Sequence, residues 1–131
     1  MTIGIIGSGA MGAGIAQVLA TAGHPVRLLD QHAGALEKAA GEERKAQEQV
    51  VAAECVLASN TSSLSVTSIA AACQRPERCL GLHFFNPAPL MQLVEIVPAV
   101  QTRPGLADEV RALVEGWGKL PVIAQDTPGF I

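Results

Sequence analysis

Short apolar runs alternate along most of this chain with segments whose apolar residues recur at helical spacing. Apolar runs bounded by Gly, Pro and polar residues predict buried strands, here at residues 2–6, 26–29, 55–58, 79–84, 93–97 and 119–124. The helical spacing predicts helices at residues 10–22, 66–73 and 106–117, the second opened by Ser65 or a nearby hydroxyl. This alternation predicts an α/β fold with a doubly wound, mostly parallel sheet and helices on both faces.

The stretch from residue 31 to residue 49 departs from this pattern, because it is the charge-rich part of the chain. Seven charged residues fall between Glu37 and Glu48. A helix is expected here, interrupted at Gly34 and Gly41. A stretch of this kind is usually a solvated face, so no chemistry is assigned to it.

Composition fits a single domain with a packed core. The chain has 131 residues, of which 49% are hydrophobic and only 3% aromatic, so the core must be built from small aliphatic side chains. The net charge of −3 and the absence of a Lys/Arg cluster argue against a nucleic-acid partner. No apolar run approaches the ~20 residues of a membrane span, and no targeting segment precedes the first predicted strand, so no membrane partner is expected.

The cysteines indicate a reducing compartment. Cys55, Cys73 and Cys79 are odd in number and lack C-x-x-C spacing, which favours reduced thiols in a cytoplasmic protein over a disulfide framework or a metal site. A catalytic cysteine is the alternative, but nothing near the three cysteines in the sequence resembles an activating base.

A glycine-rich loop joins the first predicted strand to the first predicted helix. Gly7, Gly9 and Gly12 follow the pattern G-x-G-x-x-G. The first glycine permits a tight turn, the second lets a pyrophosphate approach the main chain, and the third lets helix and strand pack closely. The N–H groups at the start of the helix then face the phosphates, so the loop predicts a Rossmann-type dinucleotide site.

An acid at the end of the second strand strengthens this prediction. Asp30 lies 23 residues after Gly7, near the ~20-residue spacing at which a carboxylate accepts hydrogen bonds from the adenine ribose. A carboxylate there repels a 2′-phosphate, which favours NAD over NADP. The alternatives are FAD, which uses the same loop, and a glycine-rich turn without a ligand.

Two polar residues interrupt apolar strands further along. His83 ends the strand in LGLHFFNP, and Glu95 lies within LVEIV. Ligands of doubly wound sheets bind outside the carboxyl ends of strands, where these side chains could form a proton-transfer dyad. A structural histidine with a salt-bridged glutamate remains the other interpretation. The hydroxyl groups of residues 59–63 could likewise serve either a functional site or a helix N-cap. His24 and His32 are interpreted as surface turn residues.

Five motifs in this order resemble the 3-hydroxyacyl-CoA dehydrogenase family: GIIGSGAMGAGIA followed by LLD, then SNTSSL, GLHFFNP, LVEIV and TPGFI. The order is similar to that of the NAD-binding domain of the family, over about residues 1–30 and 50–131. HFFNP with a downstream VEIV is far more specific than the glycine loop. EGWGKLPVIAQDTPGFI resembles hydroxyadipyl-CoA enzymes of phenylacetate breakdown, with hydroxybutyryl-CoA equally arguable.

The resemblance implies a reaction and a role for each matching residue. Hydride transfer between C3 of a 3-hydroxyacyl-CoA and NAD would give a 3-oxoacyl-CoA. The catalytic residues would be His83 as general base, Glu95 as its orienting partner, and Ser62 and Asn86 on the reacting oxygen. The residues that would bind NAD are Gly7, Ser8, Gly9, Ala10, Met11, Gly12, Asp30, Gln31, Asn60, Ser62 and Asn86.

Two departures from the family follow from the same resemblance. Between Asp30 and Asn60 the family carries several dozen more residues, so an internal segment is expected to be missing between about residues 40 and 50. The family continues after TPGFI into a helical domain that builds a homodimer, so residues 1–131 would be the NAD-binding domain alone. A chain without these parts would turn over weakly or not at all.

Two other functions stay open from the sequence. One is a non-catalytic dinucleotide-binding fragment or sensor, motivated by the expected missing segments. The other is a β-hydroxyacid dehydrogenase of the hydroxyisobutyrate type, which shares the glycine loop but relies on a lysine on the helix after the sheet. Lys119 lies where the chain leads into the last strand, not on the helix, and does not fit that position.

Overall fold

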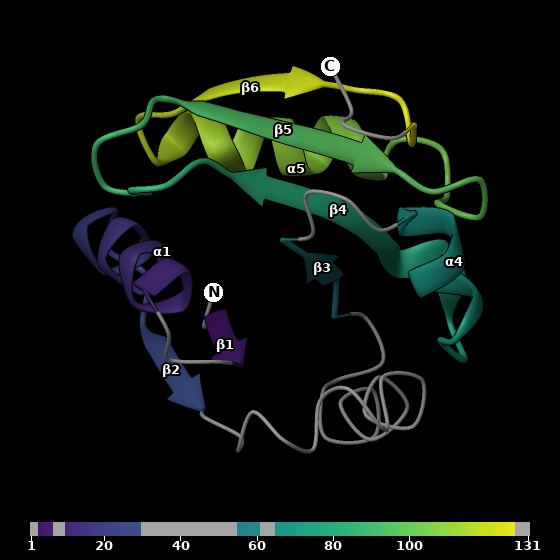
Figure 1. The fold of residues 1–131 in the computed structure, drawn as a ribbon, viewed down its shortest axis with the longest axis horizontal. Helices are drawn as coiled ribbons and strands as arrows, with labels where there is room; N and C mark the ends of the chain where they lie inside the picture. Colours follow the sequence, from purple (N-terminus) through teal and green to yellow (C-terminus); the bar gives the residue numbers. More distant parts are fainter. Residues whose placement is uncertain (1–2, 7–9, 30–54, 61–64, 128–131) are drawn as a thin grey trace.

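A computed structural model of the chain describes residues 3–6, 10–29, 55–60 and 65–127 (Figure 1). The strands are β1 (Ile3–Ile6), β2 (Val26–Leu29), β3 (Leu57–Ser59), β4 (Cys79–Phe84), β5 (Leu93–Pro98) and β6 (Leu120–Ile123). The helices are α1 (Ala10–Thr21), α4 (Val66–Ala71), α5 (Leu106–Gly116) and the 3₁₀ turn η1 (Pro76–Arg78). No helix among these described residues is long and apolar enough to cross a membrane.

Helix ends follow local chemistry. Gly23 closes α1 with a φ of 91°, and its N–H donates to Ala20 while that of His24 donates to Leu19, which is the expected C-terminal glycine motif. Ser65 caps α4 by accepting a hydrogen bond from the N–H of Ser68, as the sequence predicted. The acidic side chains of Asp108 and Glu109, in the first turn of α5, stabilise the helix because they lie near the positive end of its dipole.

Strands form two groups (Figure 1). The first is the parallel pair β1–β2, joined through α1. The second has the order β3-β4-β5-β6, in which only β4 and β5 run antiparallel. The helices α4 and α5 connect β3 to β4 and β5 to β6. The sheet is therefore mixed but mostly parallel, and the predicted α/β Rossmann-type class is confirmed.

Alternate residues of β4 and β5 separate two cores on opposite faces of the four-stranded sheet. Leu80, Phe84, Val94 and Ile96 pack with the apolar sides of α1 and α5. Cys79 and Val97, which have the opposite parity, pack with α4. Side chains of a strand point alternately to its two faces, so helices cover both faces of this sheet, as predicted.

Element boundaries differ slightly from the prediction. The third strand lies at Leu57–Ser59 rather than at residues 55–58, because its register is set by pairing with the start of β4. The second predicted helix ends at Ala71, two residues early, in a turn that closes through Ala72 and Cys73. The turn η1 was not predicted. The charged stretch at residues 31–49 lies outside the described residues.

Candidate active site

His83 and Glu95 form a hydrogen-bonded pair on neighbouring strands. They are direct partners in the antiparallel register of β4 and β5, and 3.0 Å separates His83 Nδ1 from Glu95 Oε1. Opposed residues of antiparallel strands point to the same face with Cβ atoms about 5 Å apart, which explains why the sequence brings them together. Their parity places them on the sheet face that α4 covers.

Burial defines the electrostatics of this pair. Glu95 is only 3% exposed, and the His83 side chain is 13% exposed. A buried carboxylate must be paired, and the imidazole N–H supplies a partner. When Nδ1 donates to Glu95, the lone pair of the neutral ring lies on Nε2. The pair can therefore accept a proton at Nε2 and stabilise the resulting imidazolium.

Asn60 connects the end of β3 to the strand that carries His83. Its Oδ1 accepts a hydrogen bond of 2.7 Å from the N–H of Phe84. Because β3 stops at Ser59 while β4 continues, the amide oxygen takes the place of the next strand residue. Asn86 is exposed in the loop that follows β4, beside a cis peptide bond to Pro87. Ser62 lies outside the described residues.

The first helix begins where an anion could bind. Ile6 and Leu29 are register partners, so the start of α1 and the position after β2 lie at the same edge of the β1–β2 pair. The first turn of α1 carries no acidic residue, and the N-terminal end of a helix dipole favours a negative group. Of the predicted cofactor residues, Gly7, Ser8, Gly9, Asp30 and Gln31 lie outside the described residues. Ala10, Met11 and Gly12 form the first turn.

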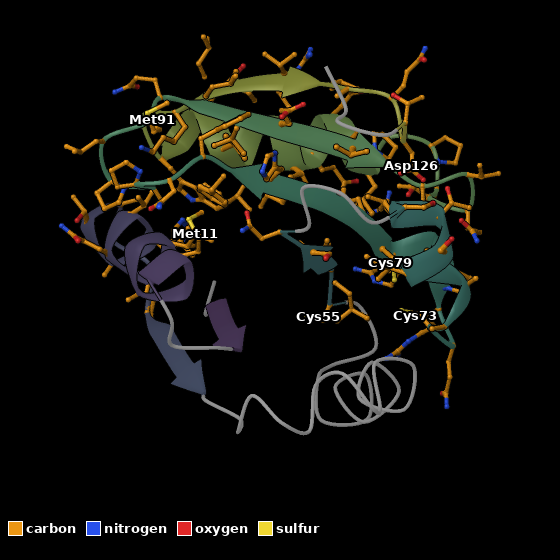
Figure 2. All side chains as sticks on the ribbon, viewed as in Figure 1. Met11, Cys55, Cys73, Cys79, Met91 and Asp126 are labelled. Carbon is orange, nitrogen blue, oxygen red and sulfur yellow. The ribbon has the colours of Figure 1, made fainter. Side chains whose placement is uncertain are left out.

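Met11 also has a packing role, which agrees with its place among the apolar residues at helical spacing in residues 10–22. Its side chain packs against the core between α1 and the four-stranded sheet, and Figure 2 shows it on the side of α1 that faces β4. Met11 is half-buried, so its side chain contributes to this core from the first turn of α1.

Gly14 is a further contact that the glycine pattern did not include. A Cβ built there would lie 3.2 Å from Pro89 Cδ and 3.4 Å from Ala88 Cβ. The turn after β4 therefore packs directly on α1. The only sequence signal was one more glycine two residues after Gly12.

His24 is not a surface turn residue without a role, and that prediction was wrong. Its Nε2 accepts a hydrogen bond of 2.9 Å from Trp117 Nε1. The indole also stacks near Phe84, with ring centroids 6.1 Å apart. These contacts join the end of α1, the end of α5 and the residue next to His83. No local pattern could reveal them, because His24 and Trp117 are far apart in the sequence.

Asp126 makes another long-range contact that the sequence did not predict. Its carboxylate accepts hydrogen bonds from the N–H groups of Val66 and Thr67, at 2.8 and 2.7 Å, and from the Ser65 hydroxyl. Figure 2 places Asp126 beside α4. Partial burial acts to raise the pKa of Asp126, but these hydrogen bonds outweigh it and hold the pKa below its usual value. The carboxylate thus caps α4 from the segment after β6.

Comparison with known proteins identifies the relatives of this chain. A family model described as "3-hydroxyacyl-CoA dehydrogenase, NAD binding domain" matches residues 2–54 and 44–127. The 3-hydroxyadipyl-CoA dehydrogenase of Escherichia coli is 37% identical over 184 aligned positions, covering 99% of this chain and 39% of the relative. A probable 3-hydroxybutyryl-CoA dehydrogenase of Deinococcus radiodurans is 34% identical, covering 100% of this chain and 66% of the relative.

Solved structures agree with these relatives. The crystal structure of a 3-hydroxybutyryl-CoA dehydrogenase from Escherichia coli has a TM-score of 0.89 and 32% identity, covering all of this chain and 39% of that one. The chain thus spans between about two fifths and two thirds of the proteins it matches. The alignment with the 3-hydroxyadipyl-CoA dehydrogenase is longer than this chain of 131 residues, so the relative has residues that this chain lacks.

Proposed function

This chain belongs to the 3-hydroxyacyl-CoA dehydrogenase family, and from that premise we propose that it is the NAD-binding part of a dehydrogenase that oxidises the 3-hydroxyl of an acyl-CoA. The observation that carries the proposal is the buried hydrogen bond between His83 and Glu95. Such a pair can take up a proton on the imidazole while the carboxylate stabilises the resulting positive charge. The family match supports neither FAD nor the hydroxyisobutyrate type of enzyme.

NAD fits the residues that are present. The parallel β1–α1–β2 unit provides a helix start free of acidic side chains, and Asp30 directly follows β2. Gly7 to Gly12 and Asp30 would hold the adenine half, while Asn60, Ser62 and Asn86 would lie toward the nicotinamide. NAD, when bound, supplies the hydride acceptor.

The proton chemistry is assigned to His83. Its Nε2 would accept the proton of the 3-hydroxyl while hydride leaves C3 with the electron pair of the C–H bond, and a carbonyl forms. The imidazolium would be stabilised by the Glu95 carboxylate, 3.0 Å from Nδ1. Ser62 and Asn86 would donate hydrogen bonds to the reacting oxygen. A positioned base of this kind typically contributes ~10²–10⁴ in rate.

The acyl group is assigned as a class rather than as one compound. Relatives are named for 3-hydroxyadipyl-CoA and for 3-hydroxybutyryl-CoA, and a structural neighbour from Ralstonia eutropha is named PaaH1. We propose an acyl-CoA substrate in fatty-acid or phenylacetate catabolism, in the cytoplasm, where the thiols expected from the odd number and spacing of the cysteines are stable. A homodimer is proposed for the full-length protein, with no nucleic-acid or membrane partner.

The experiment that tests this function uses the full-length protein, with the parts that this chain lacks, and follows NADH absorbance with NAD and each of two substrates, 3-hydroxybutyryl-CoA and 3-hydroxyadipyl-CoA. We expect turnover with at least one substrate. The His83→Ala variant should lower kcat by about 10²-fold or more, with little change in NAD affinity. Absence of NADH with both substrates would contradict the proposal.

One observation favours a second candidate, a dinucleotide-binding unit without turnover. The relatives carry positions that this chain lacks, and we propose that an internal segment is missing between about residues 40 and 50 of the single domain 1–131. Calorimetry distinguishes the two candidates. NAD binding without turnover supports the binding unit, whereas turnover supports the dehydrogenase.

A further inference from the structure

The ammonium group of Lys119 bridges two backbone carbonyls of the loop after β4. Lys119 Nζ donates to the carbonyl oxygens of Ala88 and Met91, at 2.7 Å each. Hydrogen bonds from a charged donor are stronger than neutral ones, and here both acceptors belong to one turn. The next residue reinforces the contact, because the N–H of Leu120 donates to the carbonyl of Gln92 at 2.8 Å.

The bridged loop is a compact turn whose exposed tip is held by hydrogen bonds. The N–H groups of Leu90 and Met91 both donate to the carbonyl of Pro87, which closes the turn on itself. Leu90 is 75% exposed and Met91 is 41% exposed, so burial of these side chains does not hold the turn. Figure 2 shows Met91 beside the start of β5, on the opposite side of the view from Asp126.

On its other side this turn packs against α1. Ala88 is 2% exposed and belongs to the core shared by α1, β4 and α5. The contact of Ala88 and Pro89 with Gly14 is close, since a Cβ on Gly14 would lie 3.2 Å from Pro89 Cδ. The turn is therefore held between Gly14 on α1 and Lys119, just before β6. Asn86 lies at its start, three residues after His83.

We propose that Lys119 is a positioning residue that fixes Asn86 relative to both His83 and α1. This role rests on the proposed function, in which Asn86 contacts the reacting oxygen. Lys119 acts through the turn, because its ammonium group holds the carbonyls of Ala88 and Met91. Gly14 determines how closely the turn approaches α1. Loss of the ammonium leaves the carbonyls of Ala88 and Met91 without this donor and frees the turn to move away from α1.

The test compares Lys119→Met, which keeps the aliphatic stem, with Lys119→Arg, which keeps the cation. Hydrogen exchange is measured at the amides of Leu90 and Met91 by NMR, and kcat and KM for NAD and acyl-CoA are measured in parallel. Arg103→Met is the matched control, because it removes a cation that pairs with Glu109 on the exposed start of α5. Lys119→Gln replaces the methionine variant if the latter does not fold.

In Lys119→Met we expect the exchange rate at both amides to rise about tenfold or more. The loss of a hydrogen bond from a charged donor makes local opening of the turn more frequent by about this factor. We expect kcat to fall between about tenfold and a hundredfold, with KM for NAD nearly unchanged, because displaced groups lower the rate more than binding. Lys119→Arg should recover most of both effects, and Arg103→Met should show neither.

Wild-type exchange at both amides in Lys119→Met would overturn the proposal, as would an arginine variant as impaired as the methionine variant. A fall in kcat accompanied by an equal change in Arg103→Met would also overturn it. Exchange needs no substrate, so absence of turnover in the full-length wild-type protein would contradict the dehydrogenase function, while the exchange comparison still decides the role of Lys119.

Discussion

Glu95 is the residue on which the chemistry of the pair depends most directly. It is the buried charged residue of the described part of the chain, and its carboxylate lies 3.0 Å from His83 Nδ1. A neutral amide at this position could still accept the hydrogen bond but would not offset the charge of an imidazolium. The negative charge of Glu95, rather than its shape, should therefore determine the rate.

Glu95→Gln tests this separation of charge from shape. We expect kcat to fall by about 10²-fold with NAD affinity retained, since only the charged state of His83 loses stabilisation. The measurement is steady-state kinetics together with calorimetric NAD binding. Glu115→Gln, on the exposed side of α5, is the control and should behave as wild type. Equal kcat in wild type and Glu95→Gln would show that the pair is structural.

At the scale of elements, the packing of α4 on the sheet depends on the absence of one side chain. A Cβ on Gly81 would lie 2.8 Å from Val66 Cγ2 and 3.1 Å from Val97 Cβ. Both neighbours are fully buried, so neither can move without disturbing the core on that face. Gly81 thus sets the distance between α4 and the strand that carries His83.

Gly81→Ala should lower the free energy of unfolding by about 1–3 kcal/mol, as overpacking of a filled core does. Gly116→Ala is the matched control, because nothing lies within 4 Å of the Cβ that it would add at the end of α5. The control should be neutral or stabilising by up to about 1 kcal/mol. Urea denaturation of both variants measures the difference. Equal stability of the two would mean that α4 shifts freely.

Sequence predicts these elements well where the signal is local. Apolar runs and glycine or serine caps located the strands and helices, and the interruptions at His83 and Glu95 pointed to residues that lie side by side. The contacts of Gly14, Trp117 and Asp126 were not predictable, because each depends on which distant segments the fold brings together. Gly7, Ser8, Gly9, Asp30 and Ser62 lie outside the described residues, so their roles stay predictions.

For the whole molecule, Asp126 joins the end of the described chain to a helix 60 residues earlier. Its carboxylate accepts hydrogen bonds from the first N–H groups of α4. These bonds lower its pKa in the folded state, so the stability they provide is fully present at neutral pH. That stability is lost as the pH falls through the folded pKa, which lies below the usual value near 3.8.

Asp126→Asn should therefore cost on the order of 1 kcal/mol at pH 7, as the loss of a helix cap does. The gap between wild type and variant should narrow as the pH falls below about 4, where the wild-type carboxylate begins to be protonated. Unfolding free energies measured by urea denaturation from pH 3 to pH 7 test this. A difference in unfolding free energy between wild type and Asp126→Asn that stays constant with pH would mean that the charge of Asp126 does not contribute to it.

The position of Trp117 makes this architecture observable by optical means. It is the one tryptophan of the chain, and its ring meets His24 at the end of α1 and Phe84 on β4. An indole so enclosed emits at shorter wavelength than one surrounded by water. Its emission therefore reports, without any added label, whether α1 remains docked on β4.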